Sequence, residues 1–217
     1  MMNTNSAYVI KAKTSDVKVT SSKRNGRRKN INVRKMSIIS VLSAISIMLS
    51  MSPLGYIQLG PLAITTMTIP VVIGAIMEGP KAGATIGFIF GISSMLRALN
   101  GLSGPTGFTL MNPLVSVLPR VLIGIVAYYS FKVAMKLFKN VYISGCISGA
   151  LASITNTVGV LGMIYVIYAE RYAVALKQST SSAKTLLLGI ATTNGIAEAL
   201  GGALVVSAAV VALKKSK

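Results

Sequence analysis

Six apolar segments, separated by short polar breaks, constrain the fold of this chain more than any other feature. Several of them reach the roughly 20 residues that a helix needs to cross the hydrocarbon core of a bilayer. Only 12% of the 217 residues are charged, against about 25% in soluble domains. We therefore expect an all-α integral membrane protein, a bundle of six transmembrane helices. The segments lie at 36–52, 64–78, 81–98, 113–133, 140–168 and 183–213.

The charges are distributed unevenly along the chain. Residues 1–35 carry ten Lys or Arg and one acid, so they are expected to form a disordered cytoplasmic tail. A six-helix membrane domain, 36–213, and a basic end, 214–217, follow. Six spans put both termini on one side, which collects seventeen basic residues against five on the other. Because cytoplasmic loops are enriched in Lys and Arg, both termini are expected in the cytoplasm. Translation starting at Met36 instead of Met1 is an open alternative.

Residue types needed for catalysis are scarce. The sequence has no His, a single cysteine at Cys146 and four acidic residues, and it lacks the phosphate-binding loop of P-loop ATPases. General-base chemistry, metal coordination and disulfide formation are therefore poorly supplied. We expect a protein that is not an enzyme and has no metal site or cofactor of its own. Its basic tail is interpreted as a solvated topology signal rather than a nucleic-acid-binding arm.

Glu198 lies within the apolar run LLLGIATTNGIAEALGGALVVSAAVVAL. A charged side chain at the centre of a membrane helix costs roughly 3 kcal/mol on insertion scales, so an acid here indicates a functional site. Asn194, four residues earlier, lies on the same helical face. Two roles stay open for Glu198, which are contact with a ligand and pairing with Arg120 inside the bundle.

Further polar residues gather toward the expected external half of the helices. Arginine binds carboxylates through paired hydrogen bonds, whereas Asn and Thr supply neutral donors and acceptors for hydroxyl and amide groups. Arg97 has the alternative of extending to the membrane interface without touching a ligand. The expected substrate-binding residues are Arg97, Asn112, Arg120, Asn156, Thr157, Asn194 and Glu198.

Small residues recur at helical spacing. Such stripes let helices approach closely and predict packing inside the bundle. On the first segment, Ser40 and Ala44 are one turn apart and suit docking to another membrane protein, with core packing as the alternative. The glycine stripes comprise Gly83, Gly87 and Gly91 on one segment, and Gly145 and Gly149 on another.

Four stretches of the sequence resemble a known family. They are QLGPLAITTMTIPVVIGAIMEGPKAGATIGFIFGISSMLRA, MNPLVSVLPRVLIG, SITNTVGVLG and TTNGIAEALGG. Residues 34–213 are similar to the substrate-binding S components of energy-coupling factor (ECF) vitamin transporters, and most to the pantothenate type. The resemblance implies a six-helix bundle in the bacterial cell membrane that captures a vitamin outside. It also implies association with a transmembrane coupling subunit and two cytoplasmic ATPase subunits, which use ATP.

Two features depart from the family pattern. The first helix of the family commonly carries Ala-x-x-x-Ala for docking onto the coupling subunit, whereas this chain has Ser40 and Ala44 at the matching positions. The basic tail is also longer than the family usually shows. Docking through this helix is therefore an expectation from an imperfect motif.

The residue types available for the site bear on the choice of ligand. Planar aromatic vitamins are expected to stack on Trp, Tyr or His, and this chain has no Trp, no His and 6% aromatic residues. Pantothenate, an aliphatic hydroxylated carboxylate, matches Arg with Asn and Thr better. Another vitamin or precursor, such as folate, nicotinate or biotin, stays open. So does an ion-coupled secondary carrier that uses Glu198 as a relay.

Overall fold

Six α-helices and a two-stranded hairpin make up the part of the chain that the structure describes. The computed structural model describes residues 33–52, 55–59, 62–101, 103, 107–175 and 180–215, all within the unit Asn32–Lys217. The helices are α2 (Val33–Met51), α3 (Thr68–Glu78), α4 (Pro80–Leu99), α5 (Pro113–Phe138), α6 (Val141–Ala175) and α7 (Thr180–Lys215). The hairpin consists of β1 (Tyr56–Leu59) and β2 (Leu62–Thr65), and a 3-10 turn, η2, covers Gly107–Met111.

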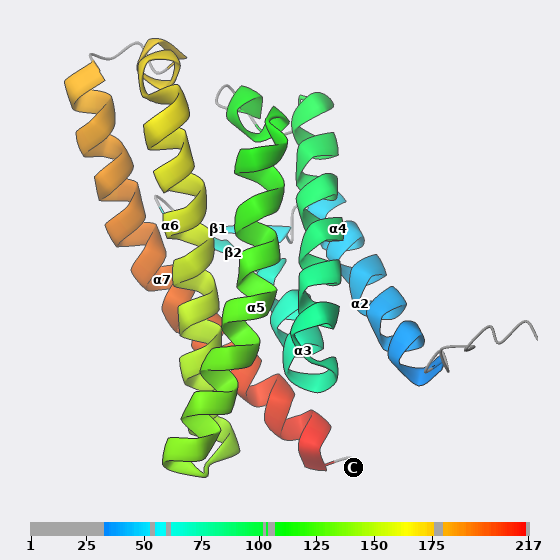
Figure 1. Ribbon diagram of the computed structural model, residues 1–217. Coiled ribbons are helices and arrows are strands. Elements are labelled where there is room, and N and C mark those ends of the chain that lie inside the picture. Colours follow the sequence, from blue (N-terminus) through cyan, green and yellow to red (C-terminus); the bar gives the residue numbers. More distant parts are fainter. Residues whose placement is uncertain are drawn as a thin grey trace, which may run out of the picture. The chain divides into compact units, whose positions relative to one another are not determined.

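The five long helices pack in a chain of neighbours, α2 on α4, α4 on α5, α5 on α6 and α6 on α7 (Figure 1). The short helix α3 packs against all five of them. Its apolar side chains Val71, Val72 and Ala75 are at most 1% exposed. Helix α3 is therefore the centre of the bundle rather than a face presented to lipid.

The segment 64–78, expected to be the second span, differs from that prediction. It begins within strand β2, and α3 has only 11 residues, about 16 Å at 1.5 Å per residue against a hydrocarbon core of roughly 30 Å. Five helices are long and apolar enough to cross a membrane. The all-helical membrane bundle is thus confirmed apart from the hairpin, and the count of six spans is not.

A tight turn at EGPK, between the predicted segments 64–78 and 81–98, joins α3 to α4. Gly79 has φ 95°, a left-handed conformation that glycine adopts without strain. Pro80 then occupies the first turn of α4, where its missing N–H would have had no helical partner anyway. This pair of residues reverses the chain with no intervening loop.

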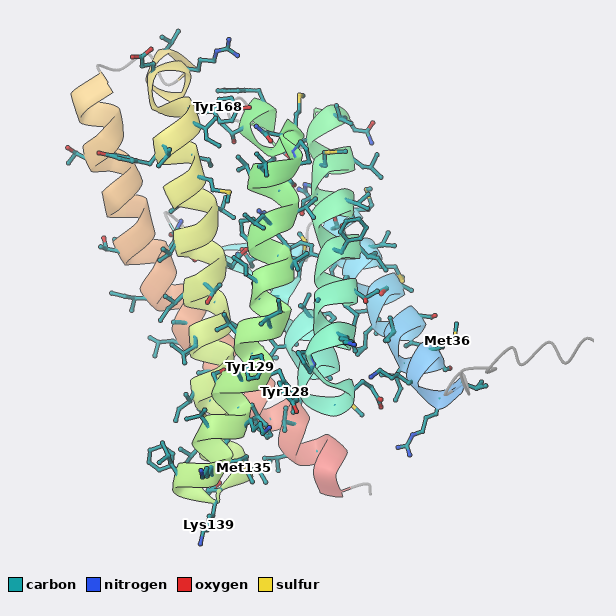
Figure 2. The ribbon with its side chains drawn as sticks, viewed as in Figure 1. Met36, Tyr128, Tyr129, Met135, Lys139 and Tyr168 are labelled. Atoms are coloured by element: carbon teal, nitrogen blue, oxygen red, sulfur yellow. The ribbon has the colours of Figure 1, made fainter. Side chains whose placement is uncertain are left out.

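Both ends of the described unit lie at one end of the bundle. Figure 2 labels Met36, near the start of α2, and Lys139, at the turn between α5 and α6, at the same lower end, where α7 also finishes. The helix α2 starts at Val33, three residues before the expected segment. The rest of the expected tail, 1–32, lies outside the described residues, and the cytoplasmic location of the termini stays a prediction.

The glycine stripes lie at helix contacts, which confirms the packing prediction. A side chain at Gly87 would overlap the backbone carbonyl of Arg120, and one at Gly91 would come within 2.7 Å of the Cα of Val117. On α6, a side chain at Gly149 would overlap the carbonyl of Gly202. Glycine at these positions lets α4 approach α5, and α6 approach α7, backbone to backbone.

Replacing Gly149 by Ala is expected to destabilise the bundle by about 1 to 3 kcal/mol, the usual penalty of overpacking. The matched control is Gly162→Ala on the same helix, where an added methyl group meets nothing within 4 Å. Because Ala forms helices better than Gly by about 1 kcal/mol, this control should be neutral or stabilising. Thermal unfolding in detergent measures both, and equal melting temperatures for the two variants would contradict the packing.

Candidate functional site

Four of the seven expected site residues lie at one level inside the bundle. We call them the polar layer: Arg120 on α5, Asn156 and Thr157 on α6, and Glu198 on α7. Helices α5 and α6 touch beside Arg120, where a side chain added at Gly159 would come within 2.9 Å of Pro119. Helices α6 and α7 are joined by the hydrogen bond from Thr157 to Glu198. All four are between 4% and 8% exposed. Buried polar groups at this depth of a membrane bundle indicate a functional site.

The position of Arg120 follows from the proline that precedes it. Pro119 lies inside α5 and has no N–H, so it leaves the carbonyl of Val115, four residues earlier, without its helical donor. The Nη1 of Arg120 donates to that carbonyl at 2.8 Å. The guanidinium also lies over the ring of Phe90, 5.6 Å from the centroid, a favourable cation–π geometry. The Pro119–Arg120 pair therefore fixes a cation in the bundle interior.

The carboxylate of Glu198 accepts hydrogen bonds from two threonines. Its Oε1 accepts from the backbone N–H of Thr65 at 3.2 Å and from the Thr65 hydroxyl at 2.5 Å. Its Oε2 accepts from the hydroxyl of Thr157 at 2.7 Å. These hydrogen bonds tie Glu198 to β2 and α6, and its contact with a ligand stays a prediction. Thr65 was not among the expected site residues.

Asn156 has a buried acceptor without a partner. Its side chain is 6% exposed, and its Oδ1 receives no hydrogen bond among the described residues. A buried amide oxygen in this state costs about 1 to 3 kcal/mol, which a ligand donor would recover. Within the polar layer, Asn156 is thus equipped to accept from a hydroxyl or an amide N–H.

The hairpin contacts the polar layer at Glu198 on α7. Figure 1 shows β1 and β2 within the bundle, away from both ends of α5, and β2 packs against α7. Non-helical backbone at membrane depth is tolerated only where protein buries it or where it lines a polar cavity. The strand β2 meets this condition on the side where its last residue, Thr65, bonds to the buried Glu198.

The three other expected site residues lie elsewhere in the bundle. Arg97 donates from Nη1 to the carbonyl of Ser50 at 2.5 Å, at the C-terminal end of α2. It follows Gly87, the neighbour of Arg120, by ten residues, about 15 Å along α4. Arg97 therefore caps the C-terminal end of α2, where a basic group interacts favourably with the helix dipole.

Asn112 belongs to a second cluster, with Tyr168 and Phe108, at the N-terminal end of α5. Its Oδ1 accepts from the N–H of Leu114 at 3.0 Å as the N-cap of the helix, and its Nδ2 donates to the Tyr168 hydroxyl at 3.2 Å. The Tyr168 ring meets Phe108 edge to face at 5.8 Å, near the upper end of the bundle in Figure 2. Asn112 precedes Arg120 by eight residues, about 12 Å along the helix.

Asn194 lies one turn before Glu198 on α7 and is half-buried. The face they share leads from the polar layer toward the end of the bundle that holds Asn112. Asn194 therefore adjoins the polar layer without being part of it.

The expected docking residues lie on the outside of α2. Ser40 and Ala44 are exposed, whereas Ser43, Ser46 and Ser50 face the bundle and are at most 5% exposed. The core-packing alternative for Ser40 and Ala44 is therefore wrong. Their exposed face is available to a partner helix, and docking itself stays a prediction.

A cavity of about 320 Å³ lies between α6 and α7. Most of its lining is apolar, including Val158, Ile196 and Leu200, which are more than 60% exposed on the outside of the bundle. Thr157 lines the cavity from within. Such a groove suits hydrocarbon, whereas the polar layer offers the charge and hydrogen bonds that a polar ligand needs.

The sequence match decides the family. Residues 34–210 match the family described as "ECF transporter, substrate-specific component". The chain belongs to this family. The resemblance of the four sequence stretches is thereby confirmed, and this S component is a transporter component rather than an enzyme. The family works with ECF membrane and ATPase subunits in general.

Two curated relatives of this S component are named for one vitamin. The "Pantothenic acid transporter PanT" of Lactococcus lactis subsp. cremoris is 27% identical over 199 residues, 84% of this chain and 94% of the relative. The "Pantothenate transporter PanT" of Leuconostoc mesenteroides is 26% identical over 186 residues, 82% of this chain and 91% of the relative. With its five span-length helices, the S component is a multi-pass bacterial membrane protein.

Proposed function

We propose that this chain captures pantothenate for an ATP-driven ECF importer and that the polar layer, together with the hairpin, forms its binding site. Both curated relatives are named for this vitamin, at 26–27% identity. The observation that carries the proposal is Arg120, buried at 4% exposure and held on the carbonyl that Pro119 frees. A cation fixed in low dielectric suits a ligand with a carboxylate.

The rest of the polar layer fits the remainder of such a ligand. Pantothenate carries hydroxyl groups and an amide beside its carboxylate. The Oδ1 of Asn156, which has no partner in the described part of the chain, can accept from a hydroxyl or an N–H, and such a buried acceptor rejects analogues that lack the donor. A binding site with these groups captures the ligand and has no means to transform it.

The same proposal includes the path across the membrane. The hairpin and α3 together take the place of one crossing. The start of α2 and the end of α7 therefore lie at the same end of the bundle, as Figure 1 shows. Lys81, Lys132, Lys136 and Lys139 belong to helices or turns at this end. Their excess supports a cytoplasmic location for both termini under the positive-inside rule.

The importer needs further subunits. This chain has no phosphate-binding loop, so ATP hydrolysis is assigned to two partner ATPases, and force transmission to a transmembrane coupling subunit. The exposed face of α2 with Ser40 and Ala44 is the proposed contact with the coupling subunit, because small side chains let helices approach closely in lipid.

The purified chain is expected to bind one pantothenate in detergent, measured by calorimetry, and to transport none in liposomes by itself. Uptake of labelled pantothenate should begin when the coupling and ATPase subunits are added with ATP inside the liposomes. It should stop when a non-hydrolysable ATP analogue replaces the ATP. Uptake by the chain alone on a proton or sodium gradient would establish a secondary carrier instead. Binding of another vitamin in place of pantothenate would refute the ligand and keep the family.

A further inference from the structure

The carboxylate of Glu198 joins three separate elements of the bundle. It belongs to α7, and it accepts from Thr65 at the end of β2 and from Thr157 on α6. Thr65 is the last residue of the hairpin and pairs with Tyr56 across the two strands. The three hydrogen bonds occupy both carboxylate oxygens, and Glu198 is 8% exposed.

The backbone of Thr65 is held on both sides. Its N–H donates to Glu198 at 3.2 Å, and its carbonyl accepts from the Thr68 hydroxyl at 3.1 Å in the first turn of α3. The N–H of Thr66 donates to the carbonyl of Gly55 at 3.1 Å and closes the base of the hairpin. Of these contacts, the one to Glu198 alone connects the hairpin to a long helix, and hydrogen bonds to a charged acceptor are the strongest of the set.

A two-stranded hairpin is marginally stable by itself. Inside a membrane bundle its position therefore depends on what it is tied to. We propose that Glu198 is a positioning residue, whose carboxylate ties the end of the hairpin to α6 and α7 and so sets the wall of the binding site. This role deepens the proposed function and rests on it only for its effect on the ligand.

The test follows the residue-65 amide by NMR in the full-length empty protein, labelled with ¹⁵N-threonine and ¹⁵N-valine in nanodiscs. Glu198→Ala should move the Thr65 signal and speed its exchange with solvent about tenfold or more, the scale of losing a charged acceptor. Glu198→Gln keeps one acceptor oxygen, so its effect should be smaller. If Glu198→Ala does not fold, Thr65→Val is the second variant: it keeps the carboxylate and the shape of the side chain, and the residue-65 amide, now labelled through valine, should exchange faster with solvent.

Matched controls are available on α6. Glu170→Gln removes an exposed acid, and Thr155→Val removes a half-buried hydroxyl that donates to the Leu151 carbonyl within α6; neither should change the Thr65 signal. Wild-type exchange and an unmoved Thr65 signal in Glu198→Ala would overturn the tie, and so would wild-type exchange of the residue-65 amide in Thr65→Val.

A second readout separates this inference from the proposed function. The rate at which bound pantothenate dissociates, measured after dilution of the complex, should rise about tenfold in Glu198→Ala and less in Glu198→Gln. If the wild-type protein binds no pantothenate but Glu198→Ala still changes the Thr65 amide, the proposed ligand is refuted and the positioning role of Glu198 stands. Bound pantothenate released at the wild-type rate, with an unchanged amide, would refute the tie and keep the ligand.

Discussion

Replacing Arg120 by Ala is expected to weaken pantothenate binding about 30-fold or more. Removing a buried charge-assisted partner costs roughly 2 to 5 kcal/mol, and each 1.4 kcal/mol is about one decade in Kd. The Arg120 guanidinium is 4% exposed and held by the Val115 carbonyl, so no neighbouring solvent can replace it. Calorimetry on the purified variant measures the loss. Arg171→Ala, at an exposed position on α6, is the matched control and should bind as the parent does.

An amide analogue of pantothenate identifies the group that Arg120 contacts. The parent should lose affinity for this analogue about as much as Arg120→Ala loses for pantothenate, and the variant should lose little more. A double-mutant cycle of this kind isolates the interaction of the two groups. Additive losses would show that Arg120 does not contact the carboxylate and serves the structure of α5 instead.

Replacing Ala44 by Trp is expected to abolish ATP-driven uptake while pantothenate binding stays within about twofold of the parent. Ala44 is exposed on α2, so the bundle accommodates the larger ring, but a partner helix needs a small residue there to approach closely. Copurification with the coupling subunit should fall at least about tenfold, since lost contacts between packed helices amount to more than 1.4 kcal/mol.

The matched control for this variant is Val133→Trp, a bulky substitution at a 57% exposed position on α5. It should leave copurification and uptake unchanged. Normal uptake by Ala44→Trp would place the docking face on another helix. Loss of pantothenate binding in Ala44→Trp would show instead that α2 shapes the site.

The sequence predicted the long helices because their signal is local. Apolar runs of sufficient length predict α2, α4, α5, α6 and α7 within three residues at most ends, whereas α5 and α6 extend five and seven residues beyond the predicted ends. The hairpin had no such signal, since its strands are four residues each and its first strand lies between the predicted segments 36–52 and 64–78. Helix α3 is apolar because the bundle surrounds it, a reason that hydropathy does not distinguish from burial in lipid.

The site was predicted in part, for a similar reason. An acid and an arginine in apolar runs drew attention to Glu198 and Arg120, and the structure places both in the polar layer. Their actual partners, Thr65 and the Val115 carbonyl, depend on pairing across the bundle and on a helix break. Thr65 was missed because a threonine in an apolar segment has no cost that would mark it. The freed Val115 carbonyl was missed too, although a proline inside a predicted helix implies one four residues earlier.

Helix α2 has an inverted polarity: hydroxyl groups of Ser43 and Ser46 face its neighbours, and hydrocarbon such as Val41 and Met48 faces outward. In water this arrangement would drive aggregation, but lipid tails solvate the outer face as well as another protein would. Leaving lipid for a partner therefore gains no hydrophobic free energy. Docking of a partner helix on this surface, as we propose it, depends on close packing and hydrogen bonds between the helices, and we expect the contact to form and separate without a large energetic penalty in either direction.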